Sequence, residues 1–446
     1  MTAANRRSPG FPHACERTLG YLSRDARGGL QVLGRDAEEL LLTFGSPLLV
    51  LLPDRVEANV RSVYDAFGSR FPAVSVHYAV KSCYYEPVVR AALRAGAGLE
   101  VMSALEMQIA EQTGCAPDGL VINGLGRDEA YVRRGVRSPG SLHVLDTWDD
   151  LTAIATAASD EQRMVDVALR VVPQMPGDLD NAMPLDSKLG NHAGSDDFWR
   201  MCDVVAEHPW LALRGLHGHQ FTRAGSPADY GQFVAGLAAV ACEAVARKGI
   251  QFDVIDIGGG FDTRSILESR GTPLSEFADV AAKELAAVPY PFLLVVEPGR
   301  YVAADAGIGL TRVRARKERE GFTWQVVDLA TNTLIPVPGA EYLPIPVQDS
   351  ECDSRISRIG DGTCAPSVIC DEIELPVTVP GTPLAILHCG AYTTVFAHVW
   401  GPRPPTVISL DGASGPVVLT GPDDFKAAAR SVYGYELDLG EMRHAP

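Results

Sequence analysis

The stretch Val76-His77-Tyr78-Ala79-Val80-Lys81-Ser82 is the part of this sequence that best indicates both fold and chemistry. Its β-branched and aromatic residues predict a strand, and Lys81 falls where that strand should end and a loop begin. Apolar walls around such a lysine depress its pKa and leave the free amine that Schiff-base chemistry requires. A lysine that only extends into solvent is the ordinary alternative, so the other strands must decide between the two.

Further apolar runs follow this stretch, and helical patterns separate them. Strands that alternate with helices form a parallel sheet covered by helices. With the first run they number eight, the number that closes a barrel. We therefore expect an α/β fold, a (β/α)8 barrel of the TIM type. The predicted strands are Val74–Val80, Leu99–Met102, Leu120–Asn123, Leu142–Asp146, Val165–Arg170, Leu213–His219, Phe252–Ile257 and Pro291–Val296.

The residues that close or follow these runs are polar, although the runs themselves are apolar. In barrels of this type the chemistry gathers at the carboxyl ends of the strands, so these residues are candidates for one site. They are Lys81, Ser103, Asn123 with Gly124, Asp146, Arg170, His219, Gly258-Gly259-Gly260, and Glu297 with Arg300.

Two of these strand ends suggest how a phosphorylated group could be held. The three successive glycines from Gly258 to Gly260 leave backbone N–H groups open to a phosphate, although a tight turn would need the same residues. Glu297-Pro-Gly299-Arg300 sets a carboxylate at a strand end and a guanidinium three residues later. The carboxylate could face a protonated ring nitrogen and the arginine a phosphate, or the two could pair within an ordinary turn.

His217-Gly-His219 places two histidines two residues apart on one predicted strand. No third ligand is evident and no CxxC pair occurs, so we expect no metal site. We expect an imidazole to stack on a flat cofactor ring instead, the alternative being a histidine satisfied within the barrel rim. The sequence has no GxxxxGK[ST] motif, no GxGxxG that opens a helix after the first strand, and no GxSxG motif.

Composition excludes some partners. The formal net charge is −17 and no block of Lys and Arg stands out, which argues against a nucleic-acid surface. The nine cysteines lack paired spacing and suit a reducing compartment. Residues 1–29 lack the apolar core of a signal peptide, and no apolar run of membrane length occurs. We therefore expect a cytoplasmic protein without a membrane or nucleic-acid partner.

Taken in order from about Gly45 to Tyr392, these motifs resemble a known family. They are similar to those of the fold-type III pyridoxal phosphate-dependent decarboxylases, the ornithine/diaminopimelate decarboxylase group, whose barrel is alanine racemase-like. The segments that carry the resemblance are Tyr78-Ala-Val-Lys81, Gly98-Leu-Glu-Val-Met-Ser103 with Glu106, Ser187-Lys-Leu-Gly190, His219, Gly258 to Gly260, Glu297-Pro-Gly-Arg300 and Gly390-Ala-Tyr392-Thr.

The resemblance implies pyridoxal 5′-phosphate as cofactor and the decarboxylation of an amino acid. Lys81 would be the Schiff-base lysine. His219 would stack on the pyridine ring, Glu297 would face its nitrogen, and Tyr392 would touch the phosphate. The cofactor-binding residues that we expect are Lys81, Arg170, His219, Gly258, Gly259, Gly260, Glu297, Gly299, Arg300 and Tyr392.

The family also has a proton-donating cysteine before the GAYT segment, and two cysteines compete for that role. Cys364 keeps the family's Thr-Cys pair and a similar spacing to Tyr392, whereas Cys370 lies too close to it. We therefore expect Cys364 to be catalytic together with Lys81. Two inert, buried thiols are the remaining alternative.

The chain from about Thr311 onward has short β-rich runs broken by Pro and Gly, which predicts a second, C-terminal all-β domain. We expect a pyridoxal phosphate-binding barrel domain at 45–310 and the β-domain at 311–446. The resemblance implies that residues 1–44 join the β-domain, and that the protein is a homodimer with shared active sites. Examples of the β-rich runs are Trp324–Leu329, Leu384–His388 and Thr406–Ser409.

Departures from the family concern the substrate. Leu329–Tyr342, where diaminopimelate enzymes carry an arginine for the distal carboxylate, has no basic residue. Ala365 stands where the diamine-forming relatives have an acidic residue. Gln220-Phe-Thr222 replaces a glycine-serine pair, and we expect Phe221 to narrow the cavity. These changes favour an unusual, conjugated or carrier-tethered amino-acid substrate, as in specialised metabolism.

Two other functions remain open. A racemase or epimerase on the same barrel would share Lys81 and the glycines, but such enzymes use a tyrosine as second base. A non-catalytic regulator with this fold should have lost the lysine or the cysteine, and both are present.

Overall fold

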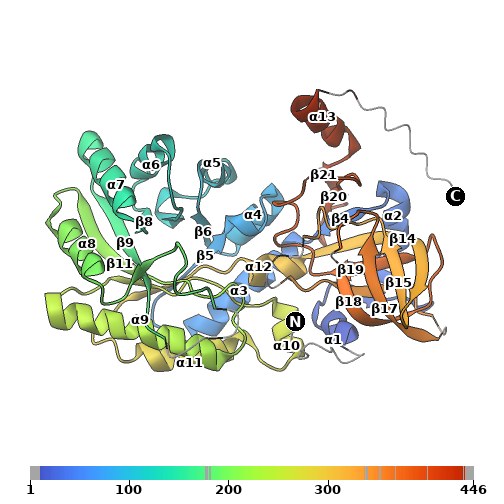
Figure 1. Cartoon of the computed structure of the whole chain (residues 1–446), viewed down its shortest axis with the longest axis horizontal. Helices are drawn as coiled ribbons and strands as arrows, with labels where there is room; N and C mark the ends of the chain where they lie inside the picture. Colours follow the sequence, from blue (N-terminus) through green and yellow to red (C-terminus); the bar gives the residue numbers. More distant parts are fainter. Residues whose placement is uncertain are drawn as a thin grey trace. The chain divides into compact units, whose positions relative to one another are not determined.

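The computed structural model describes residues 11–434 and 436, except 176–178, 180, 181, 336, 338, 339, 351, 352, 367, 399 and 435. Residues 1–10 of the predicted N-terminal segment thus lie outside the described residues. The chain forms two compact units (Figure 1). Unit 1 comprises Met1–Val56, Ser265–Gly271 and Ala303–Pro446, and unit 2 comprises Glu57–Arg264 and Thr272–Val302.

Unit 2 contains a closed barrel of parallel strands. Among the described residues, eight strands pair in the order β5-β6-β7-β8-β9-β11-β12-β13, and β13 pairs with β5. Every predicted run forms one of these strands, so the predicted α/β class and (β/α)8 barrel are confirmed. The strands are β5 (Val74–Ala79), β6 (Gly98–Val101), β7 (Leu120–Ile122), β8 (Leu142–Leu145), β9 (Val165–Val172), β11 (Leu211–His217), β12 (Val254–Asp256) and β13 (Leu293–Val296), with β10 (Asn191–His192) added beside β9.

Helices alternate with these strands along the chain, and none of the described helices is long and apolar enough to cross a membrane. The helices between or beside the barrel strands are α3 (Pro53–Gly68), which begins in unit 1, α4 (Glu86–Arg94), α5 (Ala104–Thr113), α6 (Glu129–Val136), α7 (Trp148–Glu161), α8 (Asp196–Glu207), α9 (Pro227–Lys248), α10 (Arg264–Ser269), which lies in unit 1 from Ser265 onward, α11 (Leu274–Leu285) and α12 (Arg300–Ala303).

The starts of several barrel helices follow from a single residue before each helix. A Ser, Thr or Asp side chain there accepts a hydrogen bond from the backbone N–H three residues on, which satisfies a donor that the first helical turn leaves open. Each cap therefore fixes where the loop before the helix ends and where the helix begins. The capping residues are Ser103, Asp128, Thr147, Ser195 and Ser226.

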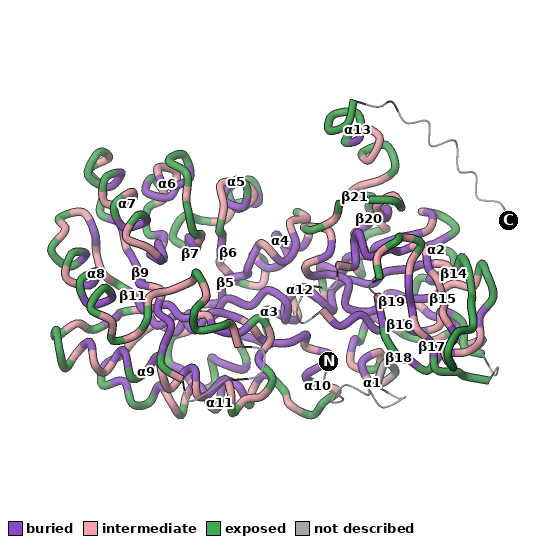
Figure 2. Tube along the Cα trace, in the orientation of Figure 1, coloured by how far each residue is buried: buried purple, intermediate pink, exposed green. Residues whose placement is uncertain are grey.

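Side-chain alternation along the strands explains why polar residues gather at one end of the barrel. The barrel interior is packed by Val121, Val144, Ala168 and Val295. Residues two positions apart on a strand share a face, so the next inward positions lie just beyond this apolar layer. These positions hold Asn123, Asp146, Arg170 and Glu297. Figure 2 shows the barrel strands as mostly buried and the outer faces of α5 to α8 as exposed.

Phe221 does not line a cavity, so the prediction made for it is wrong. Its side chain is 1% exposed, and its ring lies 6.1 Å from that of Tyr230 and 6.0 Å from that of Phe233. Both of these partners belong to α9. The apolar ring therefore packs against other aromatic rings, where it is removed from water.

Unit 1 confirms the predicted separate β-region. Its main sheet has the order β18-β17-β15-β14-β4-β20-β21, β19 also pairs with β14, and β16 with β19. Residues 48–51 form β4, which pairs with β14 and β20. The strands are β1 (Leu22–Arg24), β2 (Leu30–Val32), β3 (Arg35–Asp36), β4 (Leu48–Leu51), β14 (Gly307–Arg319), β15 (Phe322–Val327), β16 (Leu343–Pro346), β17 (Ser354–Asp361), β18 (Cys370–Pro376), β19 (Pro383–Leu387), β20 (Thr406–Ser409) and β21 (Val417–Thr420), and the helices are α1 (Phe11–Thr18), α2 (Ala37–Phe44) and α13 (Pro422–Tyr433).

Candidate active site

Lys81 lies in a short 3-10 turn, Val80–Ser82, directly after β5. Its Nζ forms an ion pair with a carboxylate oxygen of Glu100, which follows Leu99 on the neighbouring strand β6. The Glu100 side chain is fully buried and that of Lys81 is 30% exposed, so the amine is held by the protein and can still be reached. The alternative of a lysine that merely extends into solvent is therefore wrong.

A hydrogen-bonded chain connects Lys81 with Glu297. Asn123, just after β7, donates from Nδ2 to Glu100 Oε1 at 2.8 Å and to Glu297 Oε1 at 3.0 Å. Glu100 is not among the residues predicted for the site, although the sequence carries a signal for it. A carboxylate inside the apolar run Leu99–Met102 is costly to bury unless it is paired.

Glu297 carries its negative charge although it is buried. Burial alone would raise the pKa of this carboxyl, but the neighbouring His217 and Lys81 outweigh it and hold the pKa well below the ordinary value. His217 Nε2 lies 3.4 Å from Glu297 Oε2. The carboxylate at this strand end can therefore stabilise a cation that lies beside it.

The three glycines after β12 form a tight turn packed against their neighbours. Gly258 and Gly260 have φ of +62° and +85°, and a Cβ on Gly259 would lie 2.2 Å from the carbonyl oxygen of Glu297. Side chains are therefore excluded from the turn. Gly258 N–H donates to Asp256 Oδ1 at 2.7 Å, and Gly259 N–H donates to His219 Nδ1 at 3.1 Å. Among the described hydrogen bonds none comes from Gly260 N–H, which leaves that amide available to a ligand.

His219 follows β11 and is a neutral imidazole. Burial lowers its pKa to about 3, and the positive charges of Arg170 and Lys81 lower it further. His217, two residues earlier, points to Glu297 instead. Ligand atoms of His217, Asp256 and Glu297 lie within 4.8 Å of one another, but these groups bond to Asn123 and Gly258 and form a hydrogen-bonded cluster.

Arg170 and Asp146 lie at the ends of β9 and β8. The guanidinium is 3.7 Å from the Asp146 carboxylate. Gly190 N–H donates to Asp146 Oδ1 at 2.6 Å, and Asn191 Nδ2 donates to the carbonyl oxygens of Asp146 and Arg170. The predicted segment Ser187–Gly190 is thus anchored to these two strand ends.

Gly299 and Arg300 follow Glu297, and Arg300 is the first residue of α12 with 8% of its surface exposed. The carbonyl oxygen of Pro298 accepts a hydrogen bond from Ala79 N–H at 3.3 Å, which ties this loop to the end of β5. Unit 2 thus brings the predicted residues Lys81, Arg170, His219, Gly258 to Gly260, Glu297, Gly299 and Arg300 to one end of the barrel.

Cys364 and Tyr392 belong to unit 1. Cys364 is exposed in the turn after β17, where Asp361 Oδ1 accepts hydrogen bonds from Thr363 N–H at 2.7 Å and from Thr363 Oγ1 at 2.6 Å. Cys370 is buried in β18. The alternative of two buried thiols is therefore wrong for Cys364. Tyr392 has a φ of +58°, and its ring stacks on Phe396 with centroids 6.2 Å apart.

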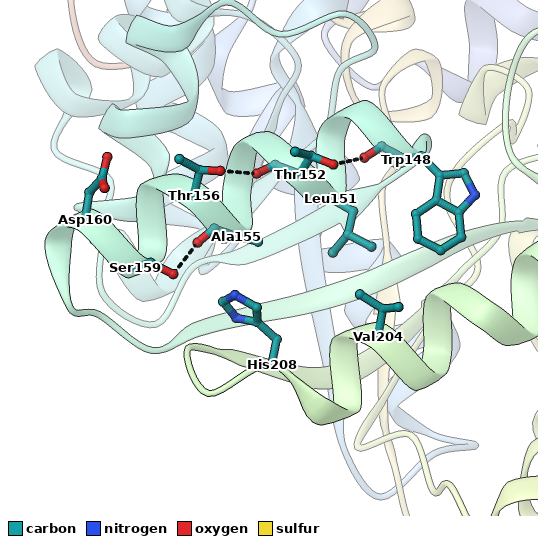
Figure 3. A pocket seen from close by; sticks show the side chains of 9 residues that line it. All are labelled: Trp148, Leu151, Thr152, Ala155, Thr156, Ser159, Asp160, Val204 and His208. Carbon is teal, nitrogen blue, oxygen red and sulfur yellow. Dashed lines mark hydrogen bonds between the residues drawn. The ribbon is translucent and has the colours of Figure 1, made fainter.

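A groove of about 420 Å³ lies elsewhere, between α7 and the end of α8 (Figure 3). Trp148, Val204 and His208 line it, with hydroxyl groups along α7. Those of Thr152, Thr156 and Ser159 donate to carbonyl oxygens of their own helix. Because its hydroxyls are already satisfied and it lies on the helices, this groove does not offer the chemistry found at the strand ends.

The strand-end residues define a class of protein: a (β/α)8 barrel enzyme in which a lysine amine, a buried anion and a glycine turn surround one site. A flat cofactor with a protonated ring nitrogen and a phosphate fits this set, because Glu297 is an anion in a buried position and none of the described hydrogen bonds comes from the half-buried Gly260 N–H. The chain belongs to the pyridoxal-dependent decarboxylases: residues 57–304 match the model of the pyridoxal binding domain of that family.

Known proteins agree with this assignment. Curated relatives include the diaminopimelate decarboxylases of Actinosynnema pretiosum subsp. auranticum, 28% identical over 406 residues (88% of this chain, 90% of the relative), and Aquifex aeolicus, 24% identical over 383 residues (84% and 89%). Similar solved structures include diaminopimelate decarboxylase from Methanocaldococcus jannaschii, with a TM-score of 0.81, 21% identity and coverage of 90% and 94%. Another is lysine/ornithine decarboxylase from Vibrio vulnificus complexed with putrescine, with a TM-score of 0.70, 23% identity and coverage of 84% and 97%.

The predicted family, the pyridoxal phosphate cofactor and pyridoxal phosphate-dependent amino-acid decarboxylation are thereby confirmed. The racemase and regulator alternatives are not favoured, since the relatives are decarboxylases.

Proposed function

We propose that this protein decarboxylates an unusual amino acid, conjugated or tethered to a carrier, in specialised metabolism. The observation that carries the catalytic part of the proposal is the chain of contacts from Lys81 through Glu100 and Asn123 to Glu297. It joins an amine and a buried anion at one end of a barrel, which are the two groups that an electron-withdrawing pyridine cofactor needs from a protein.

When bound, pyridoxal 5′-phosphate supplies an electron-poor ring that accepts the electrons left at Cα as the carboxylate departs. Lys81 holds the cofactor through its amine, and Glu100 takes or returns a proton at Lys81 Nζ. Glu297 keeps a proton on the ring nitrogen through its charge. His219 is neutral and offers a flat face for stacking.

We assign the phosphate to groups that donate hydrogen bonds or carry positive charge. Gly260 N–H, Arg300 and Tyr392 are the principal donors, and Gly299 keeps the backbone open beside Arg300. Gly258 and Gly259 act by shape, because their N–H groups already bind Asp256 and His219. Arg170, paired with Asp146, supports the cofactor from the opposite strand ends.

Cys364 is the proposed proton donor to Cα, and its exposure supports that role since the thiol can meet a substrate. The resemblance supports a homodimer in which Cys364 and Tyr392 complete the barrel site of the partner subunit. We accordingly propose a cofactor-binding domain that follows the predicted 45–310 and a β-domain that follows 311–446 together with 1–44, except that 45–56, 265–271 and 303–310 group with the β-region in unit 1. A cytoplasmic location belongs to the same proposal, on the grounds of the unpaired cysteine spacing.

The substrate proposal rests on two positions. Ala365 supplies no negative charge for a distal ammonium group, and Leu329–Tyr342 supplies no positive charge for a distal carboxylate. A site that leaves a charged end group unpaired selects against that substrate. Free ornithine, lysine and diaminopimelate are therefore disfavoured relative to derivatives whose distal group is masked.

Carbon dioxide release tests this function. The cofactor-loaded protein is given free diaminopimelate, lysine and ornithine, their derivatives acylated at the distal amine, and aminoacyl groups tethered to a carrier. We expect a masked or tethered substrate to exceed every free diamino acid by at least about tenfold in kcat/KM. Diaminopimelate as the best substrate would refute the substrate proposal, and release equal to that of Lys81→Ala with all compounds would refute the catalytic one.

A further inference from the structure

Asp256 is a buried acid at the end of β12 that the reaction described above does not use. Its side chain has no exposed surface. Oδ1 accepts the hydrogen bond from Gly258 N–H, but Oδ2 is buried and has no hydrogen-bond partner within the described residues. An oxygen of this carboxyl lies within 4.8 Å of ligand atoms of Glu297 and His217.

Two carboxyl groups this close and this deeply buried resist a second negative charge. Glu297 is the one that ionises, because Asn123 donates to it and His217 lies beside it. Burial, and then the charge of Glu297, raise the pKa of Asp256 well above its ordinary value. Titratable groups around Asp256 include Glu100 on β6, whose charge raises the pKa of Asp256 further, Tyr230 on α9, and His217 on β11, which contacts Glu297. The positive charge of Lys81 acts on Glu297.

We propose that Asp256 is a positioning residue that keeps a proton at neutral pH and presents it to Glu297. A proton on Oδ2 would give this buried oxygen a donor role and direct it at the adjacent carboxylate. It would also fix the orientation of Glu297 and leave to Glu297 the charge that faces the ring nitrogen. This inference rests on the proposed role of Glu297.

Infrared difference spectroscopy tests the proton without the cofactor. A protonated carboxyl group has a carbonyl stretching band separate from those of carboxylates. We expect the cofactor-free protein at neutral pH to show such a band, and Asp256→Asn to lose it. Labelling aspartate with carbon-13 in the unsubstituted protein should shift the band, which assigns it to an aspartate even if the variant does not fold.

Asp262 is the matched control. It is also fully buried, at 1% exposure, but it pairs with Arg223 at 3.1 Å. Asp262→Asn should leave the band in place. A spectrum without any band that depends on Asp256, or a band that Asp262→Asn removes instead, would overturn the proposal.

The positioning role of Asp256 is tested separately by measuring kcat and KM of the cofactor-loaded protein. We expect Asp256→Ala to lower kcat by about tenfold with little change in KM, short of the roughly hundredfold effect of removing a direct electrostatic partner. Asp256→Asn keeps a donor towards Glu297 and should restore most of that loss. Equal defects in the two variants would refute the positioning role. An infrared band together with no decarboxylation of any compound would instead count against the proposed function alone.

Discussion

The end of the barrel and the turn that holds Cys364 are built in opposite ways. At the strand ends, Glu100, Asn123 and Glu297 are buried and each is bonded to the next. Cys364 lies in an exposed turn held by local bonds between Asp361 and Thr363. A residue in a buried network cannot change without leaving a partner unsatisfied, whereas an exposed turn tolerates change. The difference teaches where this chain can depart from its relatives: at the substrate, and not at the cofactor.

The largest effect is expected from breaking the network at its reactive end. Lys81→Ala should lower kcat by at least about a thousandfold, because it removes the amine that carries the cofactor. The unsubstituted protein should be yellow, and borohydride should fix the cofactor covalently to Lys81, as peptide mass spectrometry can show. A borohydride-fixed cofactor on a different lysine in the variant would overturn the assignment.

The second effect concerns the exposed turn. Cys364→Ala should lower decarboxylation by about a hundredfold or more, since a positioned proton donor is lost. Cys370→Ala is the matched control, and its buried thiol should contribute nothing to the rate. A reversed result would make Cys370 the donor.

The same two variants test whether sites are shared. If Lys81 and Cys364 of one site come from different subunits, mixing inactive Lys81→Ala with inactive Cys364→Ala and allowing subunits to exchange gives heterodimers with one intact site. Activity should then return to about a quarter of that of the unsubstituted protein, because half of the dimers are mixed and each has one working site. If mixing restores no decarboxylation activity, each subunit uses its own cysteine.

The smallest expected effect is on stability, and it comes from a buried histidine that has no proposed role in catalysis. His143 on β8 is 1% exposed, and neither ring nitrogen has a hydrogen-bond partner in the described part of the chain. Burial, and then the charge of Arg127, lower its pKa to about 3. Between that value and the ordinary value near 6.5 the unfolded chain binds the proton and the folded chain does not, so stability falls as pH falls.

Urea unfolding between pH 6 and pH 4 measures this effect. The free energy of unfolding should fall by about 1.4 kcal/mol per pH unit more in the unsubstituted protein than in His143→Asn. The exposed His192 is the control, and His192→Asn should leave the slope unchanged. Equal slopes in the unsubstituted protein and in His143→Asn would show that His143 is protonated in the folded chain.

The barrel and most of its polar end could be predicted because two patterns occur together. Apolar runs alternate with helical patterns along the chain, and side chains alternate between two faces along each strand. Alternation along each strand places Asn123 after Val121 and Glu297 after Val295, so an apolar run that ends in a polar residue marks the site. The position of Lys81 followed in the same way. Sequence alone was sufficient where one strand decides the outcome.

Contacts between side chains on different strands could not be predicted from the pattern along one strand. Nothing local indicates that Glu100 meets Lys81, or that Asp256 lies beside Glu297, because each pair joins separate strands. Phe221 was misjudged for a related reason: its side chain turns to Tyr230 and Phe233 on a helix, and the sequence of one loop does not show which face its ring will take. Pairwise packing in three dimensions decides these cases.

The bond from Gly259 N–H to His219 Nδ1 has a consequence for the imidazole itself. A nitrogen that accepts a hydrogen bond cannot also carry a proton, so the neutral ring must be the tautomer with its hydrogen on Nε2. Protonation of Nδ1 would turn an attraction into a clash of two N–H groups. One main-chain amide thus selects between two chemical isomers of a side chain, and it does so from a residue whose own side chain is a single hydrogen atom.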